Sequence, residues 1–192
     1  MNEKTTLDIK NFFSDPDAVR SFAISQEYFP EETHPHKLSY RGFRTLPIKL
    51  IDEDIYSEME TKLKKKFRRP NRDCVLNAWF HYVPSNSEDT HWAYRDLADT
   101  PKIAGVIFLN PSYEQEFDFD LHMSRPETGY ISNATEDVDE MDKKRFMFGF
   151  TIPEEYNKCS MFNQFMYRRY ENPYGTSAED SPLFITFNFK YV

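Results

Sequence analysis

Histidine and carboxylate side chains are the first candidates for chemistry in this 192-residue chain. The segment HWAYRD places His91 and Asp96 just upstream of the apolar run IAGVIFLN. Imidazole and carboxylate groups that meet at the end of a strand can hold a divalent metal ion. Whether these two side chains reach one ion depends on the elements that position them.

The other reactive side chains point to simpler roles. Cys74 and Cys159 are too few and too far apart for a disulfide framework or a cysteine-based zinc site, so we expect buried thiols in a reducing compartment. His34 and His36, in THPHK, are expected to be solvated, as is the acidic run EDVDEMD at 136–142. The chain has no glycine-rich phosphate loop and no G-x-S-x-G motif.

The charge balance limits the partners. The formal net charge is -8 and the pI is about 5.2, which argues against general nucleic-acid binding. The one concentrated basic run, KLKKKFRR at 62–69, fits a phosphate-binding patch or a solvated helix end, and we favour the helix end. No stretch has the length and apolarity of a signal peptide or a membrane span, so we expect neither secretion nor membrane insertion.

Two helices are predicted in the first third of the chain. Ser14 or Asp15 can cap a helix that has Pro16 in its first turn and continues through AVRSFAISQ, with Val19, Phe22 and Ala23 expected to be buried. A second helix is predicted from Asp52. Its acidic residues come early and its basic residues late, as the helix dipole favours. Its apolar residues recur every four positions and form one stripe, expected to be buried: Ile55, Met59, Leu63 and Phe67.

Beyond Pro70 the apolar period changes to two, which predicts strands. The predicted strands are VLNAWFHYV (75–83), IAGVIFLN (103–110), RFMFGFTI (145–152), CSMFNQFMY (159–167) and LFITFNFKYV (183–192). No linker or repeat divides the chain, so we expect one domain over 1–192, with a helical part at about 14–69 and a β core at about 73–192. The predicted class is α+β, mostly β, with helices packed on one face of the β structure.

The order of these segments resembles the small phage and bacterial branch of the 2-oxoglutarate/Fe(II) dioxygenases, related to prolyl hydroxylases. The segments that carry the resemblance are NFFSDPDAVRSFA, YRGFRT, NAWFHYV, a W-x-x-x-D segment before AGVIFLNP, LHMSRPETGY, YNKCSMFNQFMYRRYENPYG and SPLFITFNFKY. It implies a double-stranded β-helix, a jelly-roll or cupin-like barrel. It also implies Fe(II) held by two histidines and one carboxylate, with 2-oxoglutarate beside it.

The residues expected to perform that chemistry are replaced. The resemblance places the family's His-x-Asp pair at Tyr94 and Asp96, the second histidine at Arg168, and the cosubstrate-binding arginine at Pro182. Neutral tyrosine is a poor ligand for Fe(II), arginine has no lone pair to offer, and proline has no guanidinium. We therefore expect Tyr94, Asp96 and Arg168 to form a polar plug, with a contact between Asp96 and Arg168.

These substitutions favour a non-catalytic protein without cofactors. We expect a binding or structural component that acts on a protein partner, as a phage accessory or virion-associated protein in the infected cell or the particle. The candidate binding surfaces are the tyrosine-rich loop YRRYENPY at 167–174 and the long polar segment 113–144. Two alternatives stay open. One is an active hydroxylase that uses Fe(II) and 2-oxoglutarate through His91, Asp96 and His122, and the other is a binder of a small molecule or sugar. His81 is expected to pack or hydrogen-bond in the barrel wall.

Overall fold

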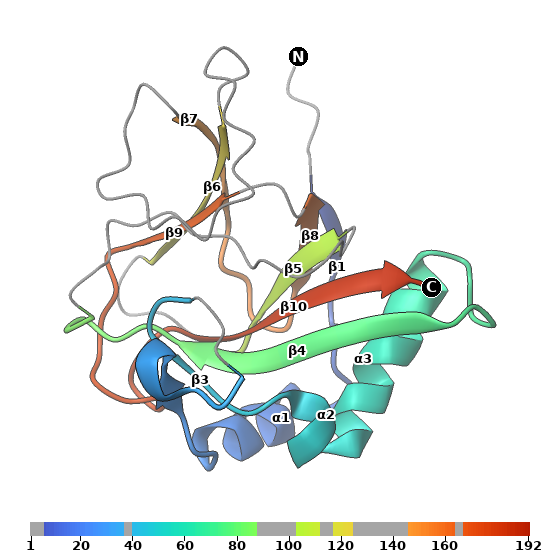
Figure 1. Cartoon of the computed structure of the whole chain (residues 1–192), viewed down its shortest axis with the longest axis horizontal. Coiled ribbons are helices and arrows are strands. Elements are labelled where there is room, and N and C mark those ends of the chain that lie inside the picture. The colour runs from blue at the N-terminus through green and yellow to red at the C-terminus, as the bar shows by residue number, and fades with distance from the viewer. Residues whose placement is uncertain (1–5, 37–39, 88–102, 112–116, 125–145, 164–166) are drawn as a thin grey trace.

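A computed structural model describes residues 6–36, 40–87, 103–111, 117–124, 146–163 and 167–192 (Figure 1). Helices and strands alternate in the first third, and strands follow. In chain order the elements are β1 (Leu7–Ile9), α1 (Pro16–Ile24), β2 (Phe29–Pro30), the 3₁₀ turn η1 (Glu31–Thr33), β3 (Phe43–Arg44), α2 (Ile48–Ile51), α3 (Glu53–Lys66), β4 (Cys74–Tyr82), β5 (Ile103–Phe108), β6 (Asp118–Ser124), β7 (Phe146–Ile152), β8 (Cys159–Asn163), β9 (Tyr167–Glu171) and β10 (Leu183–Tyr191).

Both predicted helices form where their capping residues place them. The Asp15 carboxylate accepts a hydrogen bond from the backbone amide of Ala18 at 3.0 Å, which starts α1 at Pro16. Asp52 accepts from the amide of Ile55 at 2.8 Å and starts α3. Each cap satisfies an amide that has no partner within its helix. The predicted stripe of α3 is buried except for Phe67, which is half-buried at the C-cap.

Most strands belong to one antiparallel sheet with the order β1-β8-β5-β10-β4-β3-β2. The strand β10 lies in its interior and pairs with β4 along its whole length and with β5 over six residues. The remaining strands form a smaller antiparallel sheet with the order β7-β6-β9. Apolar residues on both faces of β10 are buried, as expected for a strand covered on two sides.

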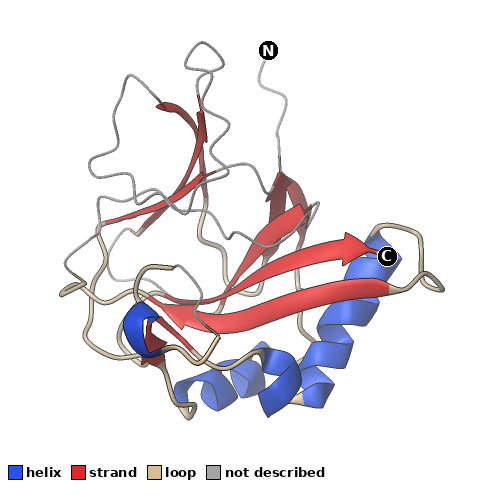
Figure 2. Ribbon diagram, viewed as in Figure 1, coloured by secondary structure: helices blue, strands red, loops and turns tan. Residues whose placement is uncertain are grey.

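Side chains from the two faces of the large sheet enter two separate cores. One face packs against the helices through residues such as Met59, Phe80 and Phe187. The other face meets the small sheet and forms what we call the inter-sheet cluster: Tyr40, Val83, Ala104, Val106, Phe108, Phe117, Phe119, Leu121, Ile152, Phe162, Tyr170 and Phe184. The result is three layers, with the helices beneath the large sheet and the small sheet above it (Figure 2). The predicted fold class is confirmed.

The structure corrects several predicted boundaries. The segment 159–167, predicted as one strand, gives β8 in the large sheet up to Asn163 and β9 in the small sheet from Tyr167. The short elements β1, β2, β3 and α2, and the strands β6 and β9, were not among the elements predicted from the sequence pattern. The predicted helical part, 14–69, therefore also supplies two strands, β2 and β3, to the large sheet, and β1 precedes it. Within the described ranges, no helix is long and apolar enough to cross a membrane.

Gly105 allows the closest packing on the helix side of the sheet. It lies opposite Phe187 in the ladder, and a Cβ there would come within 2.2 Å of the Phe187 ring. We predict that Gly105→Ala lowers the free energy of unfolding by about 1–3 kcal/mol, because the ring must move in a filled core. In urea unfolding, the double variant Gly105→Ala with Phe187→Leu should lose less unfolding free energy than the two single variants lose together. Additive losses would contradict this contact.

Candidate functional site

Arg168 lies in the space between the two sheets. It is the second residue of β9, opposite Leu121 of β6, and its side chain is only 1% exposed. Its guanidinium carbon is 5.5 Å from the centre of the Phe162 ring of β8. The position that the resemblance assigns to a metal-binding histidine is therefore filled by a buried cation facing the large sheet.

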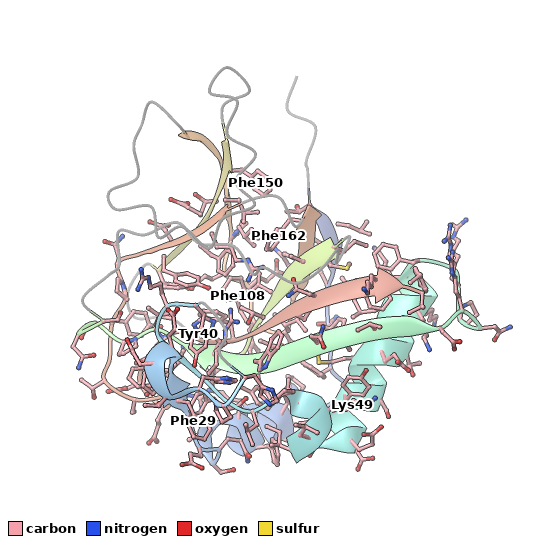
Figure 3. All side chains as sticks on the ribbon, viewed as in Figure 1. Phe29, Tyr40, Lys49, Phe108, Phe150 and Phe162 are labelled. Atoms are coloured by element: carbon pink, nitrogen blue, oxygen red, sulfur yellow. The ribbon has the colours of Figure 1, made fainter. Side chains whose placement is uncertain are left out.

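Phe184 is the centre of the inter-sheet cluster. Its ring centre is 5.5 Å from that of Tyr170 and 5.9 Å from that of Phe119, both from the small sheet. On its own sheet it is 4.8 Å from the His81 ring and 6.1 Å from Phe108. Figure 3 shows Phe108, Phe162 and Phe150 following one another from the large sheet toward the small one. Aromatic rings thus fill much of the described space between the sheets.

Pro182 is buried just before β10 begins. The chain on each side of it is fixed by hydrogen bonds. The Asn110 side-chain amide donates to the Ser181 carbonyl at 2.9 Å, and the Leu109 amide donates to the Leu183 carbonyl at 2.9 Å. Proline there supplies neither a cation nor a backbone donor. The rigid backbone holds Phe184, two residues on, against the small sheet.

A second set of buried polar contacts surrounds His81, and the part that Arg44 plays in it was not predicted from the sequence. The Nε2–H of His81 donates to the Arg41 carbonyl, and its Nδ1 accepts from Arg44 Nε at 3.4 Å. Arg44 is fully buried, with its guanidinium carbon 4.6 Å from the Tyr40 ring centre and 5.4 Å from the Trp79 ring centre. These contacts need neutral His81, so the expectation that it hydrogen-bonds in the barrel wall is confirmed.

His34 is buried, and the expectation that it is solvated was wrong. Only 3% of it is exposed, and its Nε2–H donates to the Thr45 carbonyl at 3.0 Å. Its Nδ1 accepts from the His36 amide at 3.2 Å. Burial, opposed by the Thr45 bond, lowers the pKa of His34 from its usual value of 6.5, and the positive charges of His36 and Arg44 lower it further. His36 itself is exposed, as expected.

Two polar groups on the inner face of the large sheet lack partners. Trp79 and Thr186 are opposite each other in the β4–β10 ladder, and the indole Nε1 and the Thr186 hydroxyl are buried with no hydrogen-bond partner within the described ranges. A water molecule or a small polar ligand would satisfy them. The indole can only donate, so it is not a metal ligand.

The other predicted site residues lie mostly outside the described part of the chain. His91, Tyr94 and Asp96 lie outside the described residues, so the Asp96–Arg168 contact stays a prediction. His122 lies on β6 opposite Tyr167 of β9, but its side chain is outside the described set. Among the residues that the structure does describe, no three histidine, cysteine or acidic side chains gather around a possible metal position. Cys159 is buried as expected, whereas Cys74 is half-buried and its thiol donates to Glu60 at 3.3 Å.

The architecture has clear counterparts among solved structures. A member of the 2OG-Fe(II) oxygenase family from Burkholderia pseudomallei aligns over 98% of this chain and 85% of its own, with 7% identity and a TM-score of 0.58. A prolyl-4-hydroxylase from Pseudomonas putida aligns over 97% and 92%, with 13% identity and a TM-score of 0.53. The fold is that of the 2-oxoglutarate/Fe(II) oxygenases.

A third similar structure contains a bound metal ion and 2-oxoglutarate. HygX from Streptomyces hygroscopicus, solved with nickel and 2-oxoglutarate bound, aligns over 96% of this chain and 82% of its own, with 12% identity and a TM-score of 0.54. No protein-family model matches the sequence, and a search of curated proteins gives no match. At these identities the oxygenase likeness concerns the fold.

At the two described positions that the resemblance assigns to the cofactors, Arg168 and Pro182, the residue types do not suit those groups. A site for Fe(II) needs lone-pair donors, and Arg168 brings a buried cation that would repel a metal ion. A site for 2-oxoglutarate needs a cation for its distal carboxylate, and Pro182 has none.

The buried His34 predicts a pH effect on stability. Because its folded pKa lies below the unfolded value of about 6.5, the unfolded chain takes up a proton first as the pH falls. The contribution of His34 should be complete above pH 7 and fall below it, by at most about 1.4 kcal/mol per pH unit.

The test is urea unfolding from pH 7.5 to 5.0 of the wild type, His34→Gln and His36→Gln. Subtracting the pH profile of the unfolding free energy of a variant from that of the wild type isolates the contribution of one histidine, because the other titrating groups are present in all three proteins. As the pH falls, the unfolding free energy of the wild type should fall relative to that of His34→Gln. The unfolding free energy of His36→Gln should change with pH as that of the wild type does. A constant difference between the wild type and His34→Gln would contradict a buried neutral His34.

Proposed function

We propose that this chain uses the oxygenase fold without its iron chemistry, as a non-catalytic component that binds a protein partner. The observation that carries the proposal is Arg168, buried on β9 where the resemblance expects a metal-binding imidazole. Its guanidinium carries a positive charge at every accessible pH, so the position offers repulsion to Fe(II) and not a bond.

The packing around Phe184 supports the same proposal. An iron site of this kind needs open positions for the cosubstrate and oxygen. Here the ring of Phe184 lies within about 6 Å of five other ring centres, from both sheets. Such a cluster makes the sandwich rigid, which suits a scaffold.

The partner surface belongs to the loops of this scaffold, because loops can vary in sequence without disturbing the packed core. Two candidates followed from the sequence, namely YRRYENPY at 167–174 and the polar segment 113–144. The first was wrongly expected to be a loop. It begins as β9, with Arg168 and Tyr170 buried, and among its described side chains only Asn172 is exposed. The second contains β6, in which Phe119 and Leu121 are buried, so we favour its remaining part, 125–144, which lies outside the described residues, and a virion or host protein as the partner.

Fe(II) titration in the absence of oxygen tests the proposal. With 2-oxoglutarate present, the wild type should show no charge-transfer absorption band, and on admission of air it should form no succinate. A band together with succinate would favour the active hydroxylase, in which case His91→Ala and His122→Ala should each abolish both signals.

Restoring the imidazoles tests the assignment of the positions. We predict that Tyr94→His combined with Arg168→His raises Fe(II) affinity by at least about tenfold, or about 1.4 kcal/mol of binding free energy. The matched control, Tyr94→Phe combined with Arg168→Leu, removes the same side chains and the same repulsion without adding ligands, so it should bind Fe(II) at least about tenfold more weakly than the double histidine variant. Equal affinities for the two double variants, with both folded, would show that these positions do not converge.

A further inference from the structure

A pocket lies far from the inter-sheet cluster, where α3 ends beside the last residues of β10. Its volume is about 270 Å³. It is lined by Phe67, Arg69, Arg72, Ile103, Phe189, Lys190 and Tyr191. The basic run noted in the sequence thus ends at a cavity with aromatic walls.

Two arginines of this pocket converge on one aromatic ring. The guanidinium carbons of Arg69 and Arg72 are 5.5 and 5.6 Å from the centre of the Tyr191 ring. Arg72 Nε also donates to the backbone oxygen of Val192 at 3.3 Å, which fixes its position. Both side chains are exposed, and within the described part of the chain neither pairs with a carboxylate side chain.

Three other cations of the same run, Lys62, Lys64 and Lys66, are already engaged. Lys62 pairs with Glu58 at 2.6 Å and Lys64 with Glu60 at 3.2 Å. Lys66 donates to the Asp8 carbonyl at 2.9 Å. The protein carries a formal charge of -8, so two exposed guanidinium groups at one pocket, with no carboxylate side chain paired to them among the described residues, are a local exception to its overall field.

The floor of the pocket is built from stacked rings. Phe67 lies parallel to Phe189, with ring centres 5.6 Å apart and planes at 12°. Tyr191 stands edge-on to both, at 6.3 Å from Phe67 and 5.1 Å from Phe189. Each ring is therefore held by two others, and the apolar wall is preformed.

We propose that this pocket binds a small organic anion whose charged group is attached to a flat ring. Planar guanidinium groups pair with phosphate or carboxylate oxygens, and the half-buried rings of Phe67 and Tyr191, backed by the fully buried Phe189, can contact the ligand ring. The volume is just below the usual range of roughly 300–1,000 Å³ for small-molecule sites, which suits a ligand of about the size of a mononucleotide or smaller. This inference is independent of the function proposed for the inter-sheet region.

Calorimetric titration with four probes tests the pocket: phenyl phosphate, AMP, benzoate and inorganic phosphate. At least one ring-bearing anion should bind at least about tenfold more tightly than inorganic phosphate. Preference for AMP would assign a nucleotide, and preference for benzoate would assign an aromatic carboxylate. Failure of all three ring-bearing anions to bind at millimolar concentration, or binding no tighter than that of inorganic phosphate, would overturn the proposal.

Variants with equal charge changes locate the binding. Arg69→Gln combined with Arg72→Gln should weaken the best probe at least about tenfold. The control is Lys65→Gln combined with Arg68→Gln, in the same run and equally exposed but outside the pocket, and it should leave the affinity within about twofold. Equal losses in the two double variants would show a diffuse charge effect and overturn the proposal. Thermal unfolding without ligand confirms that both variants are folded.

Discussion

The alternation of side chains along β10 is the constraint on which every layer of this protein depends. Leu183, Ile185, Phe187 and Phe189 pack against the helices, while Phe184 enters the inter-sheet cluster on the other face. One strand thus contributes to both cores, and pairing with β4 and β5 on its two sides fixes its register. A shift by one residue would exchange the two faces and place Thr186 and Asn188 among the helices. The packing on both faces therefore specifies a single register.

That register also decides what the inner face of the barrel can do. It directs Phe184 toward β6 and β9, where Tyr170 and Phe119 meet it, and Arg168 lies on the same inner side against Phe162. An oxygenase of this fold needs that region to hold a metal ion and admit small molecules. Here aromatic packing and a buried guanidinium occupy it. In the proposed non-catalytic role the fold needs no iron, because it depends on the pairing of strands and on apolar alternation.

The sequence predicted the elements whose signals are local. The Asp52 cap and four-residue spacing specify α3, and the strict alternation of 183–191 specifies β10 and its two faces. It did not predict β2 and β3, which are two residues long and exist because β3 pairs with β4 and β2 pairs with β3. The burial of His34 depends on a Thr45 carbonyl eleven residues away, and the Arg72–Val192 bond joins residues 120 positions apart. No pattern in a short window carries such contacts.

Diffraction from crystals grown with Mn(II), which replaces Fe(II) without reacting with oxygen, and 2-oxoglutarate tests the central claim most directly. Data collected at the manganese absorption edge would locate any bound ion. The account predicts no manganese peak between the two sheets, with the Arg168 guanidinium in the place that a metal-binding imidazole would take. A strong peak surrounded there by three protein ligands would contradict it.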